Sequence, residues 1–206
     1  NGNGKLDEYV EPGDPVDPTK DQRIRGVGTG GMANYGVMPS PVDDAIWISA
    51  AATPGMILRI DPGSNPPFTS LAEVYEPPLP GHTTRGIDVD RSGVVWAALN
   101  SGHLASFDRR KCKVLNGPTA TGKHCPEGWT LYQTPGPNFK GVSASGSADF
   151  HYYNWVDQFD TFGLGPDTPI ANGTLSDALL AFRPDDGEFV VLRVPYPMGF
   201  YTRGRD

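Results

Sequence analysis

The sequence has 206 residues, a formal net charge of −7 and a pI of about 5.0. This acidic average disfavours a nucleic-acid partner, because binding to phosphate backbones requires a basic surface. No run of about 18 consecutive apolar residues is present, so the sequence predicts no membrane-spanning helix. With 26 glycines, 21 prolines and 10% aromatic residues, the composition favours an all-β fold of short strands and long loops.

The first residues, NGNGKLDEYVEP, resemble the second half of an EF-hand or dockerin-type calcium loop. In such a loop Asn1 and Asn3 would donate side-chain oxygens, Lys5 would offer its carbonyl oxygen, and Asp7 would bind through water. The leading aspartate and the final acidic ligand of the pattern are missing. Two interpretations of residues 1–22 therefore stay open: a truncated loop with calcium as its cofactor, or a polar linker stiffened by proline.

Three similar segments follow in the chain: AIWISAAATPGMILRIDPGS, VVWAALNSGHLASFDRRK and DALLAFRPDDGEFVVLRVPYP. The alternation in ILRID, LASFD and LLAFR places every second side chain on one face of a strand. Each segment leads to a proline cluster and then to a basic residue followed by glycine, near positions 85, 140 and 203, with a further such pair near 25. Repeats of about 60 residues with four short strands are typical of β-propeller blades.

The second segment shows the repeat most clearly. Its sequence predicts an inner strand at 86–90, a tight turn at DRSG, and middle strands at VVWAAL and HLASFD. The pattern D-x-D-x-x-G-x-x-W, followed by a strand that ends in Phe-Asp, resembles streptogramin (virginiamycin B) lyase-like propellers and their NHL relatives. The resemblance covers roughly residues 40–206 and implies blades of four-stranded antiparallel sheets.

We therefore predict a partial β-propeller of three to four blades over residues 23–206. Ring closure needs at least about four blades and usually more. We expect the chain to be part of a longer polypeptide, or another protein chain to supply the remaining blades, because an open blade edge invites unwanted pairing.

Four basic residues mark the expected blade entries near the central channel: Arg25, Arg85, Lys140 and Arg203. A ring of such cations would hold an anionic small ligand, since guanidinium groups pair well with carboxylates and phosphates. In the alternative interpretation, each cation pairs with an aspartate of an adjacent blade, such as Asp88 or Asp206, and fixes the blade junction.

The resemblance to streptogramin lyases implies a histidine base and a divalent metal ion that together eliminate across an ester. His82, beside a proline cluster, and His151 are the positions expected to reach a channel mouth. Neither has a paired Glu or His at a recognisable spacing, which favours hydrogen-bonded structural roles. The sequence predicts no nucleotide or haem cofactor, because the glycine-rich stretch GVGTGGMANYG lacks GK[ST] and no CxxCH is present.

Residues 147–165, SADFHYYNWVDQFDTFGLG, are rich in aromatic side chains and are predicted to form an insertion in the third blade. Phe150, Tyr152, Tyr153 and Trp155 would provide a binding face for carbohydrate or for a partner protein. Alternatively, these aromatics pack the insertion onto its own blade.

Cys112 and Cys125 flank a loop rich in glycine, proline and threonine. We expect a disulfide that closes this loop, with two free thiols as the alternative. A disulfide would place the protein in an extracellular or periplasmic compartment. The sequence as a whole favours a non-enzymatic binding or assembly module of a larger exported protein, with a lyase-like enzyme as the alternative.

Overall fold

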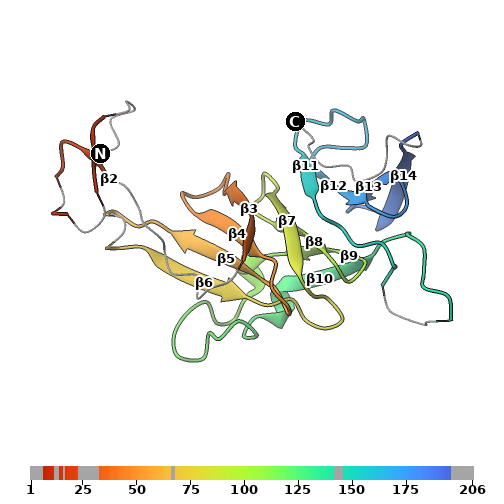
Figure 1. The fold of residues 1–206 in the computed structure, drawn as a ribbon, viewed down its shortest axis with the longest axis horizontal. Coiled ribbons are helices and arrows are strands. Elements are labelled where there is room, and N and C mark those ends of the chain that lie inside the picture. The colour runs from red at the N-terminus through yellow and green to blue at the C-terminus, as the bar shows by residue number, and fades with distance from the viewer. Residues whose placement is uncertain are drawn as a thin grey trace.

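Three four-stranded antiparallel sheets make up most of the computed structural model of this chain (Figure 1). The structure describes residues 7–11, 14–15, 17–22, 33–65, 68–141 and 146–195. Within each sheet the strands lie side by side in chain order, so each sheet is a simple meander. The prediction of an all-β fold built from four-stranded blades is confirmed.

The strands of the three sheets are short and evenly spaced along the chain. The first sheet contains β3 (Asn34–Pro39), β4 (Ile46–Ala50), β5 (Met56–Asp61) and β6 (Leu71–Tyr75). The second contains β7 (Thr84–Val89), β8 (Val95–Leu99), β9 (His103–Phe107) and β10 (Trp129–Gln133). The third contains β11 (Asn154–Asp157), β12 (Thr168–Gly173), β13 (Ala178–Arg183) and β14 (Glu188–Arg193). Two 3₁₀ turns, Arg109–Lys111 and Pro126–Gly128, flank the loop between β9 and β10.

The first strand of each sheet lies at the centre of the molecule. Strand β7 contacts both β3 and β11, whereas the later strands of each sheet lie further out. Successive sheets are therefore arranged radially, as the blades of a propeller are. Strands β7, β8 and β9 also match the three strands predicted for residues 86–108.

Two aromatic cores of the same design hold neighbouring sheets together. In each core, a Trp of the second strand and a Tyr of the outer strand pack against a Phe of the next sheet, which in turn contacts an aromatic ring of that sheet's outer strand. The first core contains Trp47, Tyr75, Phe107 and Trp129, and the second contains Trp96, Tyr132, Phe182 and Phe189. Trp47 and Trp96 thus occupy equivalent places in the two cores, as do Phe107 and Phe182.

The motif D-x-D-x-x-G-x-x-W serves the structure of the second sheet. Asp90 caps the β7–β8 turn, because its Oδ1 accepts the amides of Ser92 and Val94 and its Oδ2 accepts the indole N–H of Trp96 at 3.1 Å. Gly93 occupies the left-handed region at φ +86°, which favours glycine. Asp88 is buried and accepts the amide of Val156 in the third sheet at 2.7 Å.

The third sheet differs from the sequence-based prediction in one respect. Residues 147–165 were predicted to be an insertion, but they contain β11, the inner strand of that sheet. This strand is only four residues long. Strand β7 is followed by a tight turn, whereas β11 is followed by a long loop. Asp157 holds this loop, because its carboxylate accepts the amides of Thr161 and Phe162.

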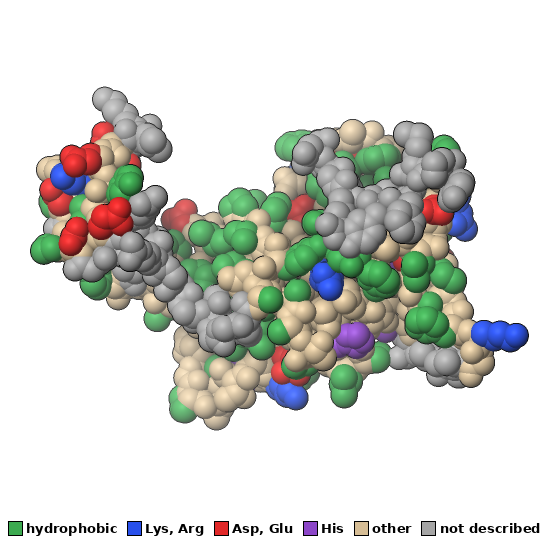
Figure 2. All heavy atoms as spheres, viewed as in Figure 1, with side chains coloured by type: hydrophobic (Ala, Val, Ile, Leu, Met, Phe, Trp, Pro, Cys, Tyr) green, Lys and Arg blue, Asp and Glu red, His purple; other side chains and the backbone are tan. Residues whose placement is uncertain are grey.

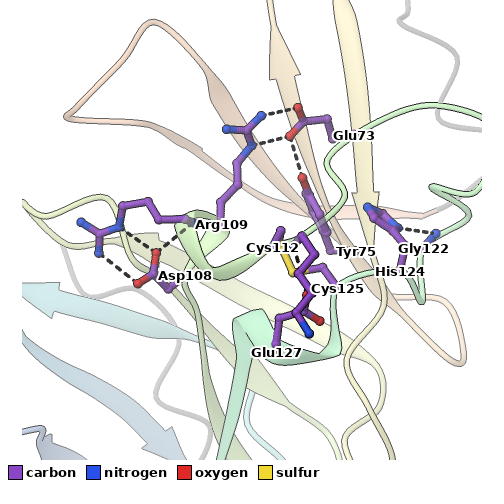
Figure 3. Close-up of a disulfide and its surroundings, with 11 residues drawn as sticks. Glu73, Tyr75, Asp108, Arg109, Cys112, Gly122, His124, Cys125 and Glu127 are labelled. Carbon is purple, nitrogen blue, oxygen red and sulfur yellow. Dashed lines mark hydrogen bonds and ion pairs between the residues drawn. A yellow bond between two sulfur atoms is a disulfide. The ribbon is translucent and has the colours of Figure 1, made fainter.

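A disulfide between Cys112 and Cys125 closes the loop between β9 and β10, as predicted (Figure 3). The closed loop reaches back to the first sheet, where Gly122 forms a β-bridge with Tyr75 and accepts the amide of Glu76 at 2.8 Å. Arg109 makes two hydrogen bonds of 2.6 Å to Glu73, which also accepts the Tyr75 hydroxyl. The loop therefore clamps the outer edges of the first two sheets together.

The carboxylate of Glu73 makes this clamp sensitive to acid. Burial alone would raise the pKa of Glu73, but the hydrogen bonds from Arg109 and Tyr75 and the nearby guanidinium charges outweigh burial and lower that pKa. Because the pKa is lower in the folded than in the unfolded chain, the stabilisation is present above the unfolded value of about 4.3. It is lost as the pH falls through the folded value.

We expect Glu73→Gln to lower the free energy of unfolding by about 2 to 4 kcal/mol at pH 7, since it leaves the charge of Arg109 without its partner. The difference from the wild type should shrink as the pH is lowered below 4 in urea-unfolding experiments. Glu188→Gln, at an exposed position, is the control and should change stability by less than about 0.5 kcal/mol. A pH-independent difference would contradict this role of the Glu73 carboxylate.

The N-terminal segment contains a short parallel pair of strands, β1 (Tyr9–Val10) and β2 (Asp21–Gln22). It lies apart from the three sheets in Figure 1, and acidic side chains gather over it in Figure 2. In the described part of this segment the chain thus folds back so that β1 and β2 lie side by side.

Candidate functional site

Arg85 lies near the start of β7, where the inner strands of all three sheets come together. Its guanidinium carbon is 4.5 Å from the ring centroid of Tyr152 and 5.1 Å from that of Tyr35. Tyr35 belongs to β3 of the first sheet, and Tyr152 lies two residues before β11 of the third. Each sheet therefore contributes one side chain to a single aromatic and cationic cluster.

The charge of Arg85 has no carboxylate partner among the described residues. Its Nε donates to the side-chain oxygen of Asn100 at 2.9 Å, and no described carboxylate lies within ion-pair distance. Asp88, one of the aspartates expected to pair with such a cation, instead accepts the amides of Val89 and Val156. A half-buried guanidinium between aromatic faces is suited to bind an anion.

Tyr35, beside Arg85, keeps a neutral phenol group at pH 7. Burial raises the pKa of Tyr35 to about 12, and the neighbouring Tyr153 adds to this effect while Arg85 opposes it. The ring of Tyr35 lies 5.7 Å from that of Tyr153, and Phe150 contacts Tyr152 at 5.2 Å. The site thus combines one cation with phenol groups and apolar ring faces. An anion that carries a flat ring matches this combination.

Gly86 explains why a glycine follows the basic residue at this place. Its amide donates to the carbonyl oxygen of Tyr152 at 2.8 Å. A Cβ atom at position 86 would lie 2.5 Å from the Cα of Tyr153, closer than side-chain atoms approach. The glycine therefore lets the second sheet approach the third closely enough for Arg85 to reach Tyr152.

Asn172 positions the two tyrosines of the third sheet and was missed as a site residue by sequence reasoning. Its side-chain oxygen accepts the amides of Tyr152 and Tyr153 at 2.9 and 2.8 Å, and its amide group donates to Thr174. Asn172 is only 1% exposed, so this N-x-T sequence is closed to modification in the folded protein. The motif that resembles a glycosylation site is a structural one here.

The other predicted cations do not join this cluster within the described residues. Lys140 is exposed in the loop after β10, and it does not share the position of Arg85 because the next inner strand begins only at Asn154. Arg25 and Arg203 lie outside the described residues, as does Asp206. On the face shown in Figure 2, Lys and Arg side chains are scattered singly. Arg85 therefore differs from Lys140, because its guanidinium lies against the rings of Tyr35 and Tyr152.

Strand β11 divides the aromatic side chains of residues 147–165 into two groups. Phe150, Tyr152 and Tyr153 precede the strand and lie at the Arg85 cluster. Trp155 lies within the strand and contacts Phe162 of the following loop at 5.8 Å. The predicted binding face of four aromatic residues is therefore not one continuous surface, and Trp155 belongs to the second group.

The two candidate catalytic histidines lie in different surroundings. His151 is fully buried, its Nδ1 donates to the carbonyl oxygen of Asn172 at 2.6 Å, and its Nε2 lies 2.9 Å from the Thr134 hydroxyl. These contacts give His151 a structural role. His82 is half-buried, with Nδ1 3.1 Å from the Thr83 hydroxyl and no described carboxylate at ion-pair distance.

Most of the predicted calcium ligands cannot be placed. Asn1, Asn3 and Lys5 lie outside the described residues. The backbone amide of Asp7 donates to the carboxylate of Asp21, on β2. In the part of the chain that the structure describes, no group of three or more His, Cys, Asp or Glu side chains is arranged to hold a metal ion.

Solved structures of a streptogramin B lyase and of virginiamycin B lyases are similar to this chain at low sequence identity. A streptogramin B lyase shares 10% identity over 81% of this chain and 56% of its own, with a TM-score of 0.46. A selenomethionine-substituted virginiamycin B lyase from Staphylococcus aureus shares 13% identity over 81% and 57%, with a TM-score of 0.38. A catalytically inactive virginiamycin B lyase from the same organism, with quinupristin, shares 14% identity over 83% and 59%, with a TM-score of 0.40.

The chain spans little more than half of the length of these lyases. No protein family model and no curated protein matches the sequence. The order and the radial packing of the three sheets make the chain propeller-like. The Arg85 cluster is its candidate functional site.

The role of Asn172 can be tested through stability. We expect Asn172→Ala to lower the free energy of unfolding by about 2 to 4 kcal/mol, because the amides of Tyr152 and Tyr153 lose their acceptor. Asn172→Asp keeps an acceptor oxygen and should cost less, and Asn116→Ala, at an exposed position, is the control. Equal effects of Asn172→Ala and Asn116→Ala in urea unfolding would contradict the positioning role.

Proposed function

We propose that this protein is a non-enzymatic binding module that holds an anionic ligand at Arg85. The observation that carries the proposal is the guanidinium of Arg85 between the rings of Tyr152 and Tyr35, without a carboxylate partner among the described residues. Arginine binds carboxylates and phosphates through its fixed fork of N–H donors. The flanking rings favour a ligand in which the anionic group is attached to a flat, apolar body.

The protein is proposed to act outside the cytoplasm. The Cys112–Cys125 disulfide supports this location, because such bridges persist in oxidising compartments such as the extracellular space or the periplasm. Among the described residues, no helix is long and apolar enough to span a membrane.

A further blade, from the same or another polypeptide, is the proposed protein partner. The face of the first sheet that is turned away from Trp47 carries Val37, Ile46 and Ile60. Val37 is 58% and Ile46 40% exposed. The equivalent face of the second sheet carries Val95 and Phe107 and packs against the first sheet. The partner would therefore present a Trp and Tyr face like those of the first two sheets.

The lyase alternative would use His82 as its base. His82 is accessible, but no described carboxylate or second histidine is placed to orient it. A binding role makes fewer demands on this site than proton abstraction does, since it needs only the cation and the rings.

Binding at Arg85 can be tested by NMR titration with benzoate and with inorganic phosphate, observing the Nε–H resonance of Arg85. We expect saturable shifts, tighter binding of benzoate than of phosphate, and a loss of affinity of about 10- to 100-fold in Arg85→Gln. Arg110→Gln, which alters an exposed arginine outside the site, should bind as the wild type does. Unsaturable shifts, or equal affinity in Arg85→Gln, would contradict the proposal.

A further inference from the structure

The loop closed by the Cys112–Cys125 disulfide contains an asparagine that is followed by glycine, at Asn116 and Gly117. Both residues are exposed. The side chain of Asn116 makes no hydrogen bond to any described residue, and the backbone amide of Gly117 has no acceptor among those residues. The carboxamide of Asn116 and the backbone nitrogen that follows it are therefore both free to react.

The backbone of Gly117 is open on all sides. Its φ is +101°, in the region that favours glycine, and a Cβ atom at this position would meet no atom within 4 Å beyond its two chain neighbours. Its carbonyl oxygen accepts the amide of Ala120 at 3.0 Å, a contact within the same turn that leaves the nitrogen of Gly117 uncovered. This nitrogen can thus approach the side-chain carbon of Asn116 without displacing another residue.

The second Asn-Gly pair in the described part of the chain, Asn172 and Gly173, lies in the opposite surroundings. Both residues belong to β12, and Gly173 is paired with Ala178 of β13. The side-chain oxygen of Asn172 accepts two backbone amides, and its nitrogen donates to Thr174. Asn172 cannot turn towards the nitrogen of Gly173 without breaking these bonds. The fold therefore protects one Asn-Gly pair and leaves the other accessible.

From this contrast we propose that Asn116 is a site of spontaneous modification, where the side-chain amide is converted to aspartate and isoaspartate. The backbone nitrogen of Gly117 loses its proton and attacks the Cγ carbon of Asn116. A succinimide ring forms through the new N–Cγ bond, the bond from Cγ to the side-chain nitrogen breaks, and ammonia leaves with the proton. Water then opens the ring at either carbonyl carbon and gives aspartate or isoaspartate.

The conversion changes the loop that clamps the first two sheets. It adds one negative charge to a chain whose formal net charge is −7, in a loop that also contains Lys113 and Lys123. Isoaspartate, in addition, lengthens the backbone of the closed loop by one methylene group. The disulfide is unaffected, so the loop stays closed. The site is separate from the Arg85 cluster, and each of the two proposals can fail without the other.

The proposal can be tested by incubating the intact, disulfide-bonded protein in ¹⁸O-labelled water at pH 8 and 37 °C. Peptide mapping by electron-transfer mass spectrometry then follows each asparagine separately. We expect aspartate and isoaspartate that carry one heavy oxygen to accumulate at position 116, and to do so more slowly at pH 6, because the attacking nitrogen must lose its proton. Asn172 should react about 100-fold more slowly than Asn116, since it reacts only after local opening has broken its hydrogen bonds.

Three controls separate the effect of the fold from that of the sequence. Asn138 is exposed like Asn116 but is followed by Phe139, so it should remain largely unconverted. Asn116→Gln should abolish the reaction at this position, because the longer side chain would have to close a larger ring. In urea-unfolded protein, Asn116 and Asn172 should react at similar rates.

Absence of conversion at Asn116 in the folded protein would overturn the proposal. Conversion of Asn116 no faster than that of Asn172 or Asn138 would overturn it as well, since the open surroundings of Gly117 would then have no effect.

Discussion

The hydrogen bond between the buried carboxylate of Asp88 and the amide of Val156 shows the constraint on which the structure depends. Inner strands of neighbouring sheets lie side by side without pairing in one sheet, yet their buried backbone groups still require partners. Side chains provide these partners: Asn154 donates to the carbonyl of Trp96, and the Ser49 hydroxyl donates to that of Arg85. Burial raises the pKa of Asp88, and the hydrogen bonds from the amides of Val156 and Val89 oppose this rise.

The proposed Arg85 site follows from these connections. The bond from Gly86 to Tyr152 brings the start of β7 against the third sheet, which places Arg85 beside the tyrosines. At the other end of the same strand, Asp90 accepts the indole N–H of Trp96 and so fixes this ring in the core between the second and third sheets. The aromatic cores and the disulfide loop hold the outer strands of neighbouring sheets together. The inner strands are connected by polar contacts instead. Strand β7 thus has the cationic Arg85 cluster at one end and the turn that fixes Trp96 at the other.

The sequence predicted the features that depend on local pattern. The strands of the second sheet follow from alternating side chains and from Asp90 and Gly93 in the turn, and the disulfide follows from two cysteines around a loop. Strand β11 was not predicted because it is only four residues long and lies within an aromatic-rich stretch that was interpreted as an insertion. Lys140 and Arg85 share a local pattern but not a place in the fold, since Arg85 lies within the inner strand β7, whereas the inner strand after Lys140 begins only at Asn154.

Arg85 was identified from sequence as a ligand-binding candidate, but its partners were not. Tyr35 and Asn100 come from other parts of the chain, and only the packing of three sheets brings them to the guanidinium. Asn172 begins an N-x-T sequence that resembles a glycosylation site. Its hydrogen bond to the backbone amide of Tyr152 is visible only in the folded structure. Long-range contacts of this kind leave no local pattern in a single sequence.

Native-state hydrogen exchange of the Val156 and Gly86 amides tests the account most directly. Both amides donate across the junction of the second and third sheets. If this junction organises the fold, both exchange only on global unfolding, as slowly as amides in the centre of β8. Exchange of Val156 and Gly86 at the rate of exposed turn amides, while β8 stays protected, would show that the sheets are held together by their aromatic cores alone.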